Sequence, residues 1–178
     1  YKRQLGGQTM NVDKELYDSY LKEAYEILKN SPNQENMTWM TGKVIEHRMA
    51  DKFFAEVRNT KGSDAIVLDD NYVQTLAHEI ELLVNDLLEI KGTVTVMRDG
   101  KTMRVASVLS KKDKMDYMVI HDGRKGVERT FIIPHDVFFA RARIGDINYT
   151  KSISWNADYV PSGVNAVNTL LLLEYEVQ

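Results

Sequence analysis

The stretch that decides the fold is TVTVMRDGKTMRV, residues 93–105. Apolar and polar side chains alternate along it on both sides of an Asp-Gly dipeptide, which is typical of two-residue β-hairpin turns. Such a turn places Val96 opposite Met103. The next pair on the same face is Val94 with Val105, so apolar side chains meet apolar side chains across the two strands. We therefore predict a β-hairpin here, with these four side chains facing the core.

Upstream of this hairpin the apolar residues recur with a helical period. Stripes at three- and four-residue spacing predict helices over about 13–28, 39–58 and 70–90. The third helix has the most regular stripe, formed by Val73, Leu76, Ala77, Ile80, Leu83, Val84, Leu87 and Leu88. Gly92 follows it, where the end of a helix favours glycine. The period then changes from 3.6 residues to 2.

Downstream of the hairpin the pattern predicts further strands. They are expected over about 115–121, 127–133, 136–143, 147–155 and 167–177. The breaks between them are too short for crossover helices, so the sheet should be mostly antiparallel. The sequence thus predicts an α+β protein, in which three N-terminal helices precede a mostly antiparallel meander, sandwich or open barrel. We expect an extended arm over 1–12, a helical part over 13–92 and a β part over 93–178 that shares its core with the helices.

Composition narrows the class of protein. The 178 residues include no cysteine, which excludes disulfides, thiolate metal sites and cysteine nucleophiles. No apolar run approaches the ~20 residues that span a bilayer, and no signal peptide is visible. We therefore favour a cytoplasmic or virion protein over a membrane protein. Because the first residue is Tyr1, we expect a trimmed sequence rather than a cleaved precursor.

Charge is distributed unevenly along the chain. Residues 1–92 carry 11 Lys and Arg against 16 Asp and Glu, whereas residues 93–151 carry 12 against 7. The segment 152–178 has three acidic residues and neither Lys nor Arg. The middle third is thus locally basic between two acidic segments, although the whole chain has a net charge of −3.

The histidines do not form a recognisable catalytic or metal motif. His78 and Glu79 resemble the start of a zinc-protease motif, but Leu82 stands where the second metal-binding imidazole is required. His121 and His135 each precede an aspartate, and neighbours on a strand face opposite sides of the sheet. We therefore predict no catalytic, cofactor-binding or metal-binding residue and no cofactor.

Basic side chains gather in the predicted β part, among aromatic ones. A surface of this kind can bind an acidic partner or stack single-stranded nucleic acid. The residues that we predict to take part in interactions are Arg98, Lys101, Arg104, Arg124, Lys125, Arg141 and Arg143.

The function favoured by these patterns is that of a non-enzymatic structural or assembly protein. It would be a subunit of a homo-oligomeric complex, for example a virion or phage head–tail component. The arm and the order of acidic and basic segments suit packing against a second copy or another assembly subunit. Two alternatives stay open. One is a small enzyme or ligand-binding domain with a site at the strand ends near His121 and His135, and the other is a nucleic-acid-binding module on the basic sheet.

Overall fold

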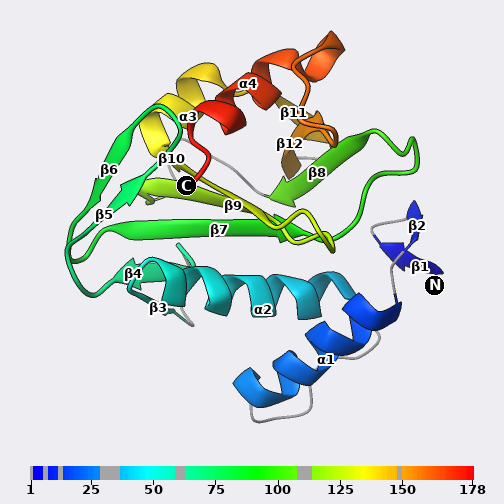
Figure 1. Cartoon of the computed structure of the whole chain (residues 1–178), viewed down its shortest axis with the longest axis horizontal. Helices are drawn as coiled ribbons and strands as arrows, with labels where there is room; N and C mark the ends of the chain where they lie inside the picture. Colours follow the sequence, from blue (N-terminus) through cyan, green and yellow to red (C-terminus); the bar gives the residue numbers. More distant parts are fainter. Residues whose placement is uncertain are drawn as a thin grey trace.

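The computed structural model has an α+β fold built around a five-stranded mixed sheet (Figure 1). It describes residues 2–5, 8–11, 14–28, 37–58, 63–107, 114–147 and 150–178. The order of strands in the main sheet is β10-β9-β7-β4-β3. Their bounds are Ala55–Val57 for β3, Ala65–Val67 for β4, Leu87–Thr93 for β7, Tyr117–Asp122 for β9 and Arg129–Pro134 for β10.

Smaller sheets and four α-helices complete the described part. The remaining strands are β1 (Lys2–Leu5), β2 (Gln8–Asn11), β5 (Asn71–Gln74), β6 (Glu79–Leu82), β8 (Thr102–Ser107), β11 (Ile144–Ile147) and β12 (Thr150–Asn156). The helices are α1 (Lys14–Leu28), α2 (Met37–Lys52), α3 (His135–Arg141) and α4 (Ala166–Glu174), with a 3-10 helix η1 (Gly163–Asn165) before α4. Strands β1 and β2 pair with each other, as do β5 and β6, while β12 lies between β11 and β8.

The elements form layers on both faces of the main sheet. Helix α2 lies along β7 on one face, with α1 packed outside it, and α3, α4 and the β11-β12-β8 sheet lie on the other side (Figure 1). The buried core draws side chains from Tyr20 in α1 through to Tyr175 after α4. Among the described strands, β7 and β9 form the one parallel pair.

The first two predicted helices are confirmed, and the third is wrong. Helices α1 and α2 correspond to the stripes at 13–28 and 39–58, although α2 ends at Lys52. The segment 70–90 instead forms β5, β6 and the start of β7. In β6, buried Ile80 and Leu82 alternate with exposed glutamates, which is a strand pattern. Short strands joined by tight turns gave apolar residues three or four apart by coincidence. Three members of the supposed stripe are exposed: Leu76, Leu83 and Val84.

The predicted hairpin turn is confirmed, but the two predicted strands do not pair with each other along their length. The Met97 N–H donates to the Thr102 carbonyl at 2.8 Å, in the expected register, and Gly100 has a φ of +70°. Val94, Met103 and Val105 are buried, and Val96 is partly buried. However, β8 pairs with β12 rather than with 94–97. The turn is specified locally, whereas each residue of β8 pairs with one that lies 44 or more residues further along the chain.

Two of the later predicted strands are helices. The segments 136–143 and 167–177 correspond to α3 and α4, while β9, β10 and β12 lie where strands were expected. The run of leucines in α4 has no period that distinguishes a buried helix from a buried strand. In the fold, Asn168, Leu171 and Leu172 are buried while Val167 and Leu170 are exposed, which is a helical pattern.

The contact between α2 and β7 depends on Gly92. A Cβ atom at this position would lie 2.6 and 2.7 Å from two side-chain carbons of Ile45 and 3.2 Å from the His121 carbonyl oxygen. Real Cβ atoms do not approach carbon so closely. The absence of a side chain at Gly92 therefore lets α2 lie directly on the sheet.

We predict that Gly92→Ala destabilises the protein by about 1–3 kcal/mol, because the new methyl group must push Ile45 away from a close-packed face. Urea unfolding measures this change. The matched control is Gly42→Ala in α2, where a Cβ meets nothing within 4 Å. That substitution should stabilise the helix by roughly 0.5–1 kcal/mol. Equal effects of both substitutions would contradict the close contact.

Candidate functional site

The candidate site lies where β4 separates from β7. Strand β4 pairs with β7 only through Leu87 and Leu88, whereas β9 follows the other edge of β7 as far as Thr93. Asp64 stands at this fork. Its N–H donates to the Leu88 carbonyl at 2.9 Å, and its Oδ2 accepts the Ile90 N–H at 2.7 Å. The carboxylate thus takes the place of a strand partner and is held firmly against β7.

Two charged residues of β7 stand beside Asp64. Glu89 and Lys91 are two residues apart, so their side chains project from the same face of the strand. The Lys91 Nζ lies 2.9 Å from the Glu89 Oε1, and neither side chain is more than a quarter exposed. The fork therefore joins one carboxylate from the start of β4 to a carboxylate and an ammonium group from β7.

Helix α2 adds a third carboxyl group. Glu46 follows Ile45, the residue that packs against Gly92, and is 9% exposed. One helical turn earlier, the Lys43 Nζ lies 3.7 Å from the Glu46 Oε1, which is too long for a hydrogen bond. We call Glu46, Asp64, Glu89 and Lys91 the acid–lysine cluster.

Burial and mutual repulsion perturb this cluster. Burial raises the pKa of Glu46 to about 7, and the Asp64 charge adds to the rise. Burial likewise raises the pKa of Glu89 to about 7, where Lys91 opposes the shift and the Asp64 carboxyl increases it. Burial alone would lower the pKa of Lys91, but the surrounding carboxylates outweigh it and raise that pKa. Lys91 therefore carries a positive charge. This charge offsets only one of the three negative charges that Glu46, Asp64 and Glu89 carry when ionised.

A group of carboxylates whose negative charge is only partly neutralised favours binding of a cation. With every group charged, the cluster has three negative charges and one positive charge in a half-buried position. Its donors to a metal are all oxygen atoms, which suits Mg²⁺ or Ca²⁺ rather than a softer ion. Within the described residues, no group of three His, Asp or Glu side chains could by itself hold a metal ion. A cation held at the cluster would therefore have to take further ligands from water or from a substrate.

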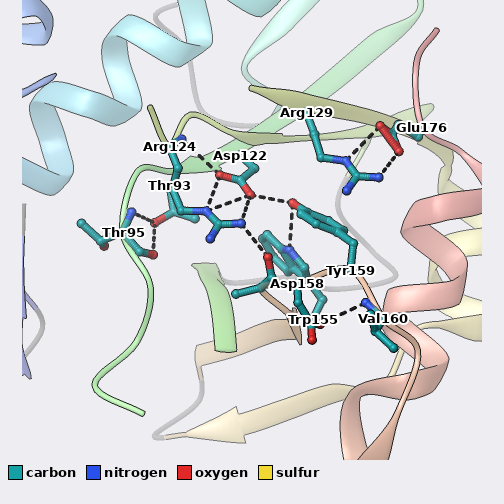
Figure 2. Close-up of polar contacts among 11 residues, drawn as sticks. Thr93, Thr95, Asp122, Arg124, Arg129, Trp155, Asp158, Tyr159, Val160 and Glu176 are labelled. Carbon is teal, nitrogen blue, oxygen red and sulfur yellow. Dashed lines mark hydrogen bonds and ion pairs between the residues drawn. The ribbon is translucent and has the colours of Figure 1, made fainter. Parts of the chain in front are cut away.

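A second polar cluster lies at the end of β9, and its buried groups pair with one another (Figure 2). The Asp122 carboxylate is fully buried, pairs with Arg124 at 2.8 Å and accepts the Tyr159 hydroxyl at 2.7 Å. The Trp155 Nε1–H donates to the same hydroxyl at 3.2 Å, and the Arg129 guanidinium lies 3.8 Å from the centre of the Tyr159 ring. Burial and the Asp122 charge raise the pKa of the Tyr159 phenol, which keeps it a donor. Because its central groups pair with one another, this Asp122 network ties β9 to the segment before α4.

The seven predicted interaction residues are spread over four places. Arg98 and Lys101 are exposed on the turn before β8, and Arg104 is half-buried in β8. After β9, Arg124 is bound to Asp122, and the Lys125 Nζ lies 2.6 Å from Glu15 on α1. At the end of α3, Arg141 pairs with Glu174, and the Arg143 N–H donates to Asn168. The role of these cations in binding stays a prediction.

The two histidines of the alternative site lie at opposite ends of β10. His121 is buried, its Nδ1 is 2.9 Å from the Thr130 hydroxyl, and burial lowers its pKa. His135 begins α3, five residues beyond Thr130, which is about 17 Å along an extended strand. The structure therefore does not bring them into one site.

The helix predicted over 70–90 would contain His78, but the structure has no helix there. His78 lies between β5 and β6 and stacks on Tyr175, with its Nε2 2.7 Å from the Glu174 carboxylate.

The sequence contained a signal for the acid–lysine cluster. The stretch LLEIKG, residues 87–92, places Glu89 and Lys91 at strand spacing within an apolar run. The helix predicted over about 70–90 contains Glu89 and ends before Lys91, so the strand spacing of the two residues was not recognised. Asp64 lies outside every predicted helix and strand, and Glu46 lies within the predicted helix over 39–58, so no pattern marked either residue.

Comparison with known proteins adds no family to this description. The chain matches none of the protein-family models with which it was compared, and no curated protein shows significant sequence similarity to it. In the described part of the chain, none of the helices has the length and apolar character to cross a bilayer. The function must therefore be inferred from the cluster itself.

We predict that, without divalent ions, the melting temperature falls as the pH rises from about 5 to 8. The carboxyls of Glu46 and Glu89 have a pKa of about 7 in the folded chain and 4.5 as the ordinary value. The folded state thus holds protons that the unfolded state releases first, and this stabilisation is lost as the pH passes 7. The Glu89→Gln variant should show a shallower fall, measured by differential scanning calorimetry.

The same experiment tests cation binding. Addition of Mg²⁺ at pH 8 should raise the melting temperature of the wild-type protein and have little effect on Glu89→Gln. Glu81→Gln, a change at an exposed residue of β6, is the control and should keep both wild-type responses. Identical pH and Mg²⁺ profiles for wild type and Glu89→Gln would show that the cluster is an inert ion-pair network.

Proposed function

We propose that the protein is a Mg²⁺-dependent phosphodiester hydrolase that cleaves nucleic acid. The observation that carries this proposal is the fork between β4 and β7, at which Asp64, Glu89 and Lys91 meet on one face of the sheet. The proposal favours the enzyme alternative over an assembly protein, at a site different from the histidines. Assembly into a virion or head–tail structure stays a separate prediction, which none of these contacts tests.

The donor set supports Mg²⁺ held jointly by protein and substrate. Mg²⁺ keeps several waters and is commonly bound through one or two carboxylates together with phosphate oxygens. Asp64 and Glu89 are the two carboxylates beside each other, and Glu46 lies near enough to interact electrostatically with Asp64 and Lys91. When bound, the ion would polarise the phosphoryl group and lower the pKa of a water molecule.

Lys91 is placed for the proton and charge changes of the reaction. In hydrolysis, water adds to phosphorus and one P–O ester bond breaks, giving a phosphomonoester and an alcohol. An ammonium group beside the carboxylates can donate to the attacking water or to a phosphoryl oxygen, where negative charge develops. Because the pKa of Lys91 is raised, the group stays charged at neutral pH and acts by electrostatic stabilisation rather than as a base.

Charge outside the cluster supports a polyanionic substrate. The segment 93–151 has five more basic than acidic residues, and Arg98 and Lys101 are exposed on the turn that follows β7. On α2, the Lys43 ammonium is one-third exposed and only loosely paired with Glu46. Basic side chains that flank a carboxylate site can hold a backbone of phosphates against the repulsion of the acids.

We predict that the purified protein cleaves nucleic acid in the presence of Mg²⁺ and stops doing so when EDTA is added. Asp64→Asn and Lys91→Ala should each lower the rate of cleavage by about 10²–10³-fold, as loss of one stabilising group typically does. Labelled single- and double-stranded DNA and RNA, separated on denaturing gels, identify the substrate. Glu81→Gln controls for the preparation and should retain full activity.

Cleavage that persists in EDTA or in Asp64→Asn would point to a contaminant or to a different site. If wild-type protein cleaves none of the four substrates over a range of Mg²⁺ concentrations, the proposed function is wrong.

We predict that Lys43 binds a phosphate near the cleaved bond. In Ca²⁺, which permits binding but slows cleavage, Lys43→Gln should weaken binding and make the slope of log Kd against log salt shallower by about 1. Fluorescence anisotropy measures both quantities. Lys22→Gln on α1 is the control and should leave the slope unchanged. An unchanged slope for Lys43→Gln would leave Lys43 with only its contact to Glu46.

A further inference from the structure

Arg58 directly follows β3 and is half-buried, yet it forms no ion pair with any of the described carboxylates. Arginine is rarely buried unless its charge is paired. Three other half-buried arginines follow this rule, since Arg48, Arg124 and Arg129 each pair with a carboxylate, whereas Arg104 in β8 does not. A half-buried guanidinium group without a carboxylate is available to an anion from outside the chain.

The backbone fixes Arg58 beside the acid–lysine cluster. Strand β3 lies at the edge of the main sheet and pairs with β4 as far as Val57 and Ala65 (Figure 1). The Arg58 N–H then donates to the Asp64 carbonyl at 2.8 Å, which extends this pairing by one residue. Asp64 is itself bonded to β7 through its own N–H and its carboxylate. Arg58 is thus one strand away from Asp64 and two strands away from β7.

Alternation places the Arg58 side chain on the face of the sheet that carries the charged residues of β7. In β3, Ala55 is buried and Glu56 is exposed, so Arg58 shares the outward face of Glu56. The register continues this face across the sheet through three partners: Glu56, Ile66 and Leu87. The next side chains of β7 on the same face are Glu89 and Lys91. Because Glu56 is exposed, this face is open to a ligand at β3.

From this position we infer that Arg58 binds a phosphate group of the nucleic acid substrate, close to the bond that the acid–lysine cluster would cleave. This role of Arg58 rests on the proposed function, because the phosphate belongs to that substrate. A guanidinium group stays charged at every working pH and offers two parallel N–H donors that match a phosphate. It can therefore hold the backbone of an oligonucleotide but cannot act as a base.

Distance across the sheet assigns Arg58 to a neighbouring phosphate rather than to the one that is cleaved. Adjacent strands lie about 4.8 Å apart, so Arg58 is roughly 10 Å from β7. One nucleic acid strand carries a phosphate about every 3.4 Å along the helix axis, so Arg58 should meet a phosphate about two or three nucleotides from the cleaved bond. Lys91, which pairs with Glu89, keeps its place beside the reacting phosphate.

We expect Arg58→Gln to weaken binding of labelled DNA or RNA oligonucleotides by about 10–100-fold, as loss of a charged hydrogen bond does. The slope of log Kd against log salt should become shallower by about 1. Fluorescence anisotropy in Ca²⁺ measures both. Arg58→Lys should keep the wild-type slope but only part of the affinity, because lysine binds phosphate as a point charge. Lys22→Gln, which removes an exposed charge from α1, is the control and should match the wild-type chain.

Kinetics separate Arg58 from the groups at the reacting phosphate. A contact made two or three nucleotides away is equally strong in the ground state and in the transition state. Arg58→Gln should therefore raise KM by about 10–100-fold with little change in kcat, whereas Lys91→Ala should lower kcat. A fall in kcat with unchanged KM in Arg58→Gln would contradict the assignment to a neighbouring phosphate.

A neutral methylphosphonate, introduced at one position of the oligonucleotide at a time, locates the phosphate that Arg58 holds. At that position the replacement should weaken binding by the wild-type chain and leave binding by Arg58→Gln unchanged, because the two changes remove the same contact. Circular dichroism establishes that each variant is folded. If Arg58→Gln does not fold, Arg58→Lys takes its place, and the replacement should then cost less than it costs the wild-type chain.

The outcomes for Arg58 and for the proposed function can be told apart, because binding in Ca²⁺ requires no cleavage. A wild-type chain that cleaves in Mg²⁺, with the same Kd and salt slope in Arg58→Gln, would overturn the role of Arg58 and leave the hydrolase standing. A wild-type chain that binds without cleaving would overturn the hydrolase, and the salt slope of Arg58→Gln would still decide the phosphate contact. A chain that binds none of the oligonucleotides would overturn both.

Discussion

The direct contact of α2 with β7 at Gly92 is the constraint on which the rest of the structure depends. Gly92 has no side chain, and Ile45 fills the space that a Cβ would need. This contact fixes the depth of α2 on the sheet and therefore the position of Glu46, the next residue of the helix. It also lies one residue after Lys91. Core packing and assembly of the charged cluster are thus consequences of the same close approach.

The acid–lysine cluster is costly to folding, and this cost is what makes it a candidate for function. A carboxyl group whose pKa is raised to about 7 has lost more from desolvation and repulsion than it has regained from its partners. The Asp122 network shows the opposite arrangement, because its buried carboxylate is met by Arg124 and by the Tyr159 hydroxyl. The chain can satisfy a buried acid completely. That it does not do so at the β4–β7 fork favours a site that an external cation completes.

The structure also separates two kinds of surface on opposite sides of the main sheet. Helix α2 contributes charged residues to the fork, whereas α4 exposes valine and leucine without charge. The Asp122 network joins the end of β9, the parallel neighbour of β7, to the segment before α4.

The sequence by itself determined the features that depend on near neighbours. The α+β class, helices α1 and α2, the turn at Asp99-Gly100 and the strands β9 and β10 all follow from local period and turn chemistry. Tertiary structure decided whether ambiguous apolar runs became strands or helices. The segment 70–90 became strands because β5 and β6 pair with each other and the start of β7 pairs with β4 and β9. The segment 166–174 became a helix that packs on β12 and β10.

The acid–lysine cluster is one of the features that only the tertiary structure decided. Its members come from α2, the start of β4 and β7, and they meet only because antiparallel pairing and the close approach at Gly92 bring distant positions together. A pattern in one stretch of chain can show that Glu89 and Lys91 share a face. It does not contain the contacts that add Asp64 and Glu46, because those are set by packing between elements.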